Sequence, residues 1–229
     1  MSPIAANLQA IRRRIFEALQ GDSRAIRLVA VTKSQAPEAV RAAFAAGVRD
    51  FGESYVQEAL PKIAALEGLE ATWHYIGHLQ TNKAREVASH FDWVHAIDRP
   101  KAAAALSRAR EGAPRPLQVC IQVNISGEAS KGGVAPGEAL GLAREVAALP
   151  GLKLRGLMGM ASLTGDVGSQ REQFATLART RREIEAAGIP LDTLSMGMSH
   201  DFEAALAEGA TLVRIGTAIF GERKGRKAA

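Results

Sequence analysis

Lys33 is the first residue whose type and position could support chemistry. It follows the apolar segment LVAVT, which ends at Thr32. An amine at the end of a buried strand can act as a nucleophile toward an aldehyde when its surroundings lower its pKa. Most lysines at strand ends are simply solvated, so position alone leaves both interpretations open.

A second group of polar residues lies in the segments LSMGMSHDFEAAL and VRIGTAIFGER, near the other end of the sequence. Ser199 precedes an Ala-rich helical pattern and is predicted to cap it, at a helix N-terminus that favours anions. Gly197 leaves room for a close backbone approach, and Gly216 and Thr217 could add N–H and hydroxyl donors. Together they predict an anion site, although an ordinary N-cap and a packing glycine would explain them separately.

Arg214 lies between Val213 and Ile215 in an apolar segment. A guanidinium in such a place cannot lose its charge cheaply and must find a polar partner. That partner is either a ligand or a carboxylate of the protein interior such as Glu53. The sequence leaves these two possibilities equally open.

The histidines do not form a metal-binding pattern. His74 and His78 have the spacing H-x₃-H, but we expect His74 in a strand and His78 in the next loop, with no cysteine or acidic cluster to complete a ligand set. His95 and His200 could act as acid or base groups, but a lone histidine is more often a satisfied polar residue. We therefore predict no metal site.

Eight apolar segments alternate with Ala-rich amphipathic segments along the chain. The predicted strands are 27–32, 49–54, 73–77, 93–98, 117–124, 154–161, 193–197 and 212–220. Helical patterns such as 37–47 and 171–188 end at Gly47 and Gly188, which are natural C-caps. Strict alternation favours a parallel sheet, and eight units in 229 residues predict a closed (β/α)₈ TIM barrel of the α/β class. An open doubly wound sheet is less favoured, because no Gly-rich nucleotide turn follows the first strand.

A barrel would bring the candidate residues to one face. Residues that follow the C-terminal ends of barrel strands share one rim, and phosphate sites commonly follow strands seven and eight. The loop GHLQTNKAREV after the third strand would add Asn82 to this rim. Asn124, Ser126 and Lys131, after the fifth strand, are expected to form turns.

Composition places the chain among globular proteins, with 47% hydrophobic and 23% charged residues. No apolar run is long enough to cross a bilayer, and Ile4, Leu8, Ile11 and Ile15 predict an N-terminal helix instead of a signal peptide. A single cysteine, Cys120, suits a reducing cytoplasm. No shift in composition marks a boundary, so residues 1–229 are expected to form one domain.

The net charge of +5 and a pI of about 9.7 favour an anionic partner, either a phosphorylated small molecule or nucleic acid. Part of the charge comes from Arg223, Lys224, Arg226 and Lys227, which are expected to form a solvated tail. Aromatic residues make up only 5% of the chain, and no aromatic-interleaved basic stripe is present. The sequence therefore disfavours a nucleic-acid-binding module.

Seven segments resemble, in order, the pyridoxal phosphate homeostasis protein family: LVAVTKSQ, DFGESYVQE, WHYIGHLQTNK, VNISGEASKGG, LRGLMGM, SMGMSHDFEAAL and VRIGTAIFG. Members of this family are similar to the barrel domain of alanine racemase and of fold-type III decarboxylases, but lack their second, β-rich domain. The resemblance covers nearly the whole chain, which likewise stops shortly after the eighth predicted strand.

The resemblance implies that pyridoxal 5'-phosphate (PLP) is bound as a Schiff base on Lys33. It implies that Ser199, Gly216 and Thr217 hold the phosphate and that Arg214 faces the pyridine nitrogen.

Asn82, from the segment LQTNK, and Met198 are implied as further pocket residues. The sequence departs from many relatives at Ser54, where an asparagine is expected, and at His200, where a small or acidic residue is expected. Ser54 is retained only as a residue of the barrel mouth, and His200 puts only the local electrostatics in question.

The implied arginine argues for a carrier and against an enzyme. An arginine near the ring nitrogen disfavours its protonation and weakens PLP as an electron sink. The similar racemases also take a second acid/base group from the domain that is missing here.

We expect a cytoplasmic, monomeric PLP-binding protein of vitamin B6 and amino-acid homeostasis. Its expected partners are PLP and PLP-dependent apo-enzymes, with no nucleic acid and no membrane. The alternative is a small PLP-dependent racemase or decarboxylase.

Overall fold

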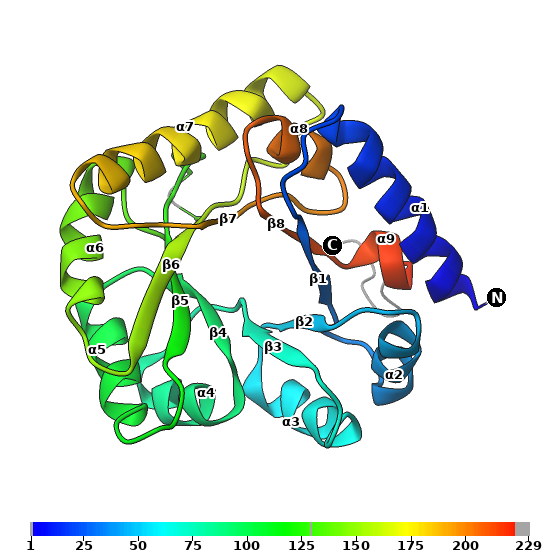
Figure 1. The fold of residues 1–229 in the computed structure, drawn as a ribbon, viewed down its shortest axis with the longest axis horizontal. Helices are drawn as coiled ribbons and strands as arrows, with labels where there is room; N and C mark the ends of the chain where they lie inside the picture. Colours follow the sequence, from blue (N-terminus) through cyan, green and yellow to red (C-terminus); the bar gives the residue numbers. More distant parts are fainter. Residues whose placement is uncertain (1, 129, 223–229) are drawn as a thin grey trace.

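The strands of the protein close into a parallel barrel. The computed structural model describes residues 2–128 and 130–222, and within them each strand pairs with its neighbours in sequence order until β8 returns to β1 (Figure 1). This confirms the predicted (β/α)₈ barrel. The strands are β1 (Arg27–Val31), β2 (Asp50–Glu53), β3 (Thr72–Tyr75), β4 (Trp93–Ile97), β5 (Leu117–Gln122), β6 (Leu152–Met158), β7 (Thr193–Ser195) and β8 (Leu212–Ile215).

Helices surround the barrel, as Figure 1 shows. They are α1 (Pro3–Leu19), α2 (Pro37–Ala45), α3 (Val56–Ala65), α4 (Ala84–His90), α5 (Pro100–Ala109), α6 (Ala139–Ala147), α7 (Val167–Ala186), α8 (Phe202–Ala207) and α9 (Thr217–Phe220), with short 3₁₀ turns η1 (Thr81–Lys83) and η2 (Pro136–Glu138). Helix α2 is followed by Gly47 and α7 by Gly188, both at positive φ, as the C-cap prediction required.

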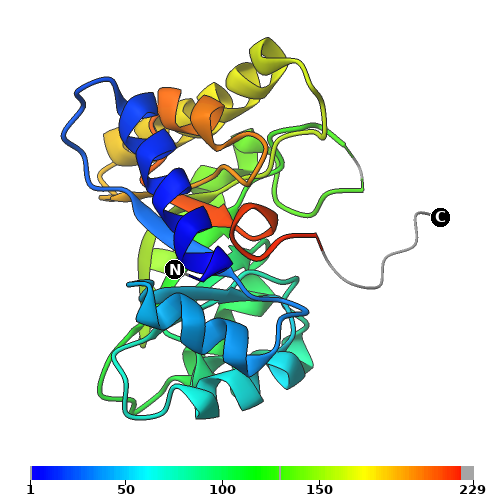
Figure 2. The same ribbon diagram turned by 90° about the vertical axis from the view of Figure 1, so that its right-hand side faces the viewer.

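The predicted N-terminal helix is present as α1. It buries Leu8, Ile11 and Ile15 and packs against α8 and α9, which lie beside it in Figure 2. The Asn7 side chain donates a hydrogen bond of 2.9 Å to the carbonyl of Ile219 in α9. Helix α1 therefore supports the segment that follows the last strand.

The predicted eighth strand, 212–220, is too long. Strand β8 ends at Ile215, and the amides of Ile219 and Phe220 donate to the carbonyl of Gly216, which forms the turn of α9. The error has a physical reason: Ile219 is fully buried against the core, so a helical turn and a continued strand give the same apolar run.

The buried apolar residues form two groups. The larger fills the space between the strands and the helices. The smaller, Trp93, Cys120 and Met158 with Met160 against it, is a separate cluster formed by residues of β4, β5 and β6. Burial raises the pKa of the Cys120 thiol to about 12, so the thiol is not a reactive group at neutral pH.

Two histidines are buried with this smaller cluster. The His74 ring lies stacked on the Trp93 ring with a centroid distance of 5.4 Å, and His95 lies 5.8 Å from the same ring. Both histidines are fully buried, and burial lowers the pKa of His74 and lowers the pKa of His95 further. Both imidazoles are therefore neutral at physiological pH.

The basic tail residues Arg223, Lys224, Arg226 and Lys227 lie outside the described residues. In the part of the chain that the structure describes, no helix combines the length and apolar character needed to cross a membrane.

The neutral histidines predict that acid destabilises the fold. Below the ordinary histidine pKa of 6.5 the unfolded chain takes up protons that folded His74 and His95 do not, so stability falls as pH falls. Each histidine contributes a slope of up to about 1.4 kcal/mol per pH unit. Urea denaturation between pH 7 and 5 measures this slope. It should be smaller in His95→Gln than in wild type; equal slopes in wild type and His95→Gln would contradict the assignment.

Candidate functional site

Three neighbouring strands carry most of the predicted site residues. In the ladder between β1 and β8, Ala30 lies opposite Ile215, and β7 pairs with β8 through Ser195 and Leu212. The strands are parallel, so the segments that follow them meet at one rim. Lys33, which is half-buried, is the second residue after β1.

The start of α9 packs directly against the end of β1. A Cβ atom built on Gly216 would lie 3.4 Å from both the Cβ and the carbonyl oxygen of Val31, which is ordinary van der Waals contact. Val31 is two residues before Lys33, and Thr217 is the first residue of α9. The structure therefore brings Lys33, Gly216 and Thr217 to one region of the rim.

Ser199 does not cap the helix that follows it, contrary to the sequence prediction. The N-cap position of α8 belongs to Asp201, and the Oγ atom of Ser199 instead accepts a hydrogen bond of 3.2 Å from the amide of Ala218. The cause is a tight turn, in which the Met198 amide donates to Asp201 Oδ1 (2.5 Å) and the Asp201 amide donates to the Met198 carbonyl. Ser199 is thereby directed at the first turn of α9.

Gly197 makes this turn possible. Its φ of +94° lies in the left-handed region, and a Cβ atom there would come within 2.8 Å of the Cβ of Ala205 in α8. Its carbonyl accepts a hydrogen bond of 2.9 Å from the amide of Arg214. Gly197 therefore fixes the segment after β7 against both α8 and β8.

Arg214 lies inside the barrel and is only 4% exposed. Its Nη1 donates to the carbonyl and to the Oγ of Ser195, both at 2.6 Å, and its Nη2 donates to the carbonyl of Gly159 at 3.0 Å. Burial lowers the pKa of Arg214 to about 10, so the guanidinium is still charged at neutral pH. These hydrogen-bond partners are neutral oxygens.

Glu53, the alternative partner considered for Arg214, binds other groups. Its Oε1 accepts hydrogen bonds from Lys62 Nζ (2.7 Å) and Thr32 Oγ1 (2.5 Å), and Lys62 Nζ also donates to the carbonyl of Thr32 (2.8 Å). Burial raises the pKa of Glu53, while the hydrogen bonds from Lys62 and Thr32 oppose that shift. This buried pair fixes Thr32, the residue that precedes Lys33.

The sequence prediction missed Lys62 and Thr32. A signal was present, because Val56, Ala59 and Lys62 recur at a spacing of three on the buried face of α3. A lysine on such a face needs a buried partner. The identity of that partner depends on how α3 packs on β2, which the sequence does not state.

Asn82 lies apart from the β7–β8–β1 rim. It is exposed in η1, after β3, and lines a surface groove with residues of α4 and α5, including Arg85 and Arg108. Met198 is half-buried beside Ser199. Ser54, after β2, lines a cavity of about 370 Å³ with Tyr75, the last residue of β3, and His78 in the loop that follows.

The segment after β5 forms the turn that the sequence predicted. The Asn124 side chain donates to the carbonyls of Glu128 (2.9 Å) and Lys131 (3.1 Å) and accepts from Ser126 and the amide of Gly127. Among the residues described, no group of three or more His, Cys, Asp or Glu side chains is arranged to hold a metal ion.

The geometry defines a class of protein. Three adjacent strands of the TIM barrel carry the candidate groups. They are a lysine amine after β1, the Ser199 hydroxyl after β7, a buried arginine in β8, and the Thr217 hydroxyl at the start of α9. This donor set suits an anion close to an amine. The sequence profile described as "Alanine racemase, N-terminal domain" matches residues 2–224. The chain therefore belongs to the alanine racemase N-terminal domain family.

Within that class, curated relatives of similar length carry one name. The chain is 51% identical over 226 residues to the pyridoxal phosphate homeostasis protein of Pseudomonas aeruginosa, covering 97% of each chain, and 45% identical over 229 residues to the protein of that name from Escherichia coli K12, covering 97% of this chain and 98% of the relative. The chain thus belongs to the pyridoxal phosphate homeostasis protein family, as the sequence motifs indicated.

Solved structures agree on the fold. PipY of Synechococcus elongatus, solved with PLP bound, superimposes with a TM-score of 0.83 at 36% identity over 95% of this chain and all of that chain. Alanine racemase of Corynebacterium glutamicum superimposes with a TM-score of 0.71 at 18% identity, over 99% of this chain and 63% of the racemase. At that identity the racemase likeness concerns the barrel fold alone.

The Gly197 turn supports a stability prediction. Gly197→Ala must accept both a left-handed backbone and a Cβ contact of 2.8 Å, whereas Gly209→Ala, at a φ of +95°, has no other heavy atom closer than 3.8 Å to its Cβ. We expect Gly209→Ala to lose about 1 kcal/mol of unfolding free energy and Gly197→Ala to lose about 1–3 kcal/mol more. Urea denaturation measures both, and equal losses would contradict the role of the close contact.

Proposed function

We propose that this protein binds PLP through Lys33 and acts as a carrier in intracellular vitamin B6 and amino-acid homeostasis, without catalytic turnover. The observation that carries the proposal is the convergence of Lys33, the Ser199–α9 segment and Arg214 on three adjacent strands. The names of the relatives from P. aeruginosa and E. coli and the PLP-bound PipY structure support it.

Each residue has a distinct part in the proposed site. PLP, when bound, supplies an aldehyde with which a lysine amine can condense, a phosphate group and a pyridine ring. Lys33 provides the amine, and Ser199, Gly216 and Thr217 hold the phosphate through hydroxyl and backbone N–H donors. Met198 and Asn82 are proposed as further pocket residues. Asn82 is the least supported of these, because it follows β3 and is exposed.

The environment of Arg214 supports the proposal that the protein is not an enzyme. Its guanidinium is charged, buried and held by Ser195 and Gly159, so it is a fixed positive charge inside the barrel. A fixed cation opposite the ring nitrogen disfavours protonation of that nitrogen, and an unprotonated ring withdraws electrons weakly. Arg214 therefore favours storage of the cofactor over carbanion chemistry.

The remaining parts of the proposal concern the whole protein. We propose that residues 1–229 form one barrel domain, that the protein is a cytoplasmic monomer, and that PLP-dependent apo-enzymes receive PLP from it. The single cysteine, which is buried inside the barrel, is compatible with a reducing compartment. A small PLP-dependent racemase or decarboxylase is the competing function.

The Lys33 linkage is testable by absorption spectroscopy. After addition of PLP and dialysis, wild-type protein should keep a visible absorption band, and Lys33→Ala should lose it because the condensing amine is gone. Lys83→Ala is the matched control, since Lys83 follows β3 and pairs with Glu86 at 2.9 Å. A band retained in Lys33→Ala, or absent from wild type, would refute the proposed linkage.

The absence of turnover is a separate prediction. PLP-loaded wild-type protein should racemise or decarboxylate common amino acids no faster than Lys33→Ala protein mixed with the same amount of PLP. Chiral chromatography of the reaction mixtures measures racemisation, and the release of CO₂ measures decarboxylation. Steady turnover that rises in proportion to wild-type protein would instead favour the enzyme.

A further inference from the structure

A chain of buried hydrogen bonds crosses the inside of the barrel from Arg214 to the opposite mouth. We propose that Asp50, His74, His95 and Ser195 act in series as positioning residues, and that they hold Arg214 in place from the N-terminal ends of the strands. The proposal rests on the proposed function only in its last step, in which Arg214 faces bound PLP.

The chain is continuous. Arg214 Nη1 lies 2.6 Å from Ser195 Oγ, and Ser195 Oγ lies 2.8 Å from His95 Nδ1. His95 Nε2 lies 2.9 Å from His74 Nδ1, and His74 Nε2 lies 2.9 Å from Asp50 Oδ1. The chain thus joins residues of β8, β7, β4, β3 and β2.

The donor and acceptor at each link follow from chemistry. The Asp50 carboxylate can only accept, so the Nε2–H of His74 donates to it. A neutral imidazole has one donor, so His74 Nδ1 accepts from the Nε2–H of His95, and His95 Nδ1 accepts from the hydroxyl of Ser195. Ser195 Oγ then accepts from Arg214, a group with donors only. All links therefore run in one direction, from the cation to the carboxylate.

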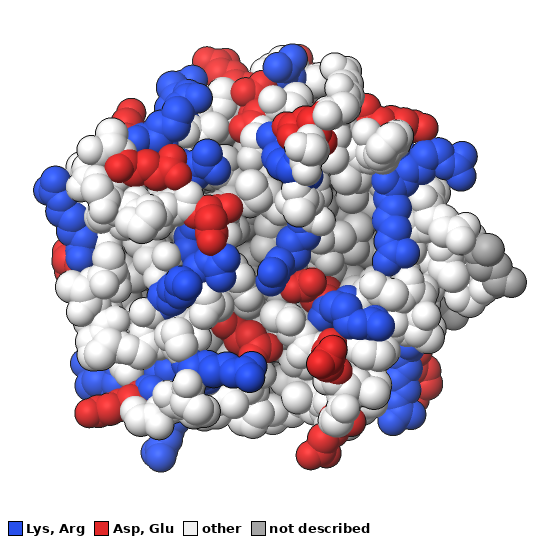
Figure 3. All heavy atoms as spheres, viewed as in Figure 1, with Lys and Arg blue, Asp and Glu red and all other residues white. Residues whose placement is uncertain are grey.

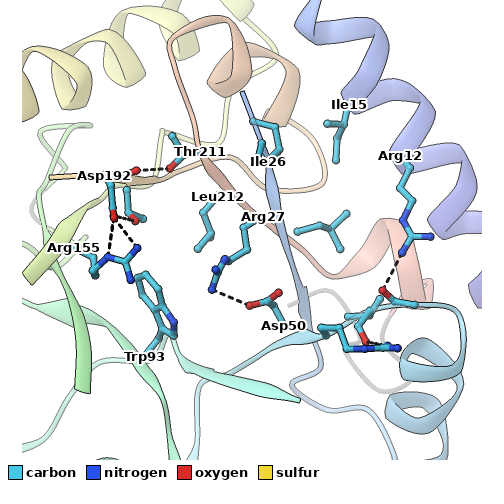
Figure 4. A pocket seen from close by; sticks show the side chains of 16 residues that line it. Arg12, Ile15, Ile26, Arg27, Asp50, Trp93, Arg155, Asp192, Thr211 and Leu212 are labelled. Carbon is cyan, nitrogen blue, oxygen red and sulfur yellow. Dashed lines mark hydrogen bonds and ion pairs between the residues drawn. The ribbon is translucent and has the colours of Figure 1, made fainter. Parts of the chain in front are cut away.

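The two ends of the chain have different access to solvent. Arg214 is buried, whereas the Asp50 side chain is 19% exposed and lines a cavity of about 650 Å³ with Arg27, Trp93 and Asp192 (Figure 4). These residues begin or precede strands, so the cavity is at the N-terminal mouth of the barrel. Figure 3 shows the protein from the same side as Figure 1, and on this face basic and acidic side chains lie intermixed around a central hollow. Asp50 is the end of the chain that solutes can reach.

Asp50 determines the order of the chain. Without its carboxylate, His74 Nε2 has no fixed acceptor, and the opposite hydrogen-bond order becomes available to both imidazoles. In that opposite order His95 and Arg214 both donate to Ser195 Oγ, and the buried Ser195 hydroxyl hydrogen loses its acceptor, so Ser195 must turn and its contact with Arg214 changes. Arg27 Nη1, at 3.3 Å from Asp50 Oδ1, is a donor and cannot replace the carboxylate as acceptor.

The same mouth offers a matched control. Asp192 lines the same cavity and pairs with Arg155 at 2.6 Å, as Asp50 pairs with Arg27 (Figure 4). Asp192 has no link to the two histidines in the described chain. Removing it therefore removes a carboxylate from the mouth and leaves the hydrogen-bond chain intact.

Nitrogen-15 NMR of the imidazoles tests the order directly, in protein without PLP. In wild type, both His74 and His95 should be neutral Nε2–H tautomers. Asp50→Ala should introduce the Nδ1–H tautomer at one or both, while Asp192→Ala should retain the wild-type pattern. Nδ1–H tautomers in wild type, or an unchanged pattern in Asp50→Ala, would overturn the proposed order.

The effect on Arg214 is tested in PLP-loaded protein. Asp50→Ala should weaken PLP retention about tenfold, the effect of losing a hydrogen bond to a charged group, and should shift the visible band. Ser195→Ala removes the same link by a smaller change and should give the same shift. If PLP binds but neither variant differs from Asp192→Ala, the positioning role is wrong. If wild type binds no PLP, the proposed function fails, and the NMR result still decides the hydrogen-bond order.

Discussion

Main-chain hydrogen bonds between β1 and β8 join the first and last strands of the chain and close the barrel. Closure gives the strands no open edge and leaves their C-terminal ends on one rim. Lys33 then lies near Gly216 and Thr217, although more than 180 residues separate them in sequence. Helix α1 adds to this constraint, because Asn7 binds the α9 backbone and holds the segment after β8 in place.

Charges inside the barrel determine much of the remaining detail. A buried charge is stable only when hydrogen bonds or an opposite charge replace its water. Lys62 meets this condition with Glu53 and Thr32, and so fixes the residue before Lys33. Arg214 meets it with Ser195 and Gly159, and through Ser195 it connects to the buried histidines. The rigidity of the site thus comes from polar groups in the barrel interior as well as from the apolar core.

The sequence by itself determined the architecture and supplied the residues of the proposed site. Alternating apolar and amphipathic segments reflect the periods of strands and helices, and eight repeats in this length permit a barrel. The motifs at 33 and at 197–217 identified the family, and the N-terminal helix followed from the spacing of Ile4, Leu8, Ile11 and Ile15. These features are local in sequence, so a single sequence contains them.

Only the tertiary structure decided the features that depend on neighbours distant in sequence. The apolar run 212–220 divides into β8 and α9 where the amides of Ile219 and Phe220 bind the carbonyl of Gly216, and Ser199 binds Ala218 because a turn closed by Asp201 directs it there. Lys62 was readable as a buried lysine but not as the partner of Glu53, and His74 and His95 gave no sign of the chain from Asp50 to Arg214. The physical reason is common to all four: a packing contact or hydrogen bond depends on distance and direction in space, which the fold sets and sequence spacing does not.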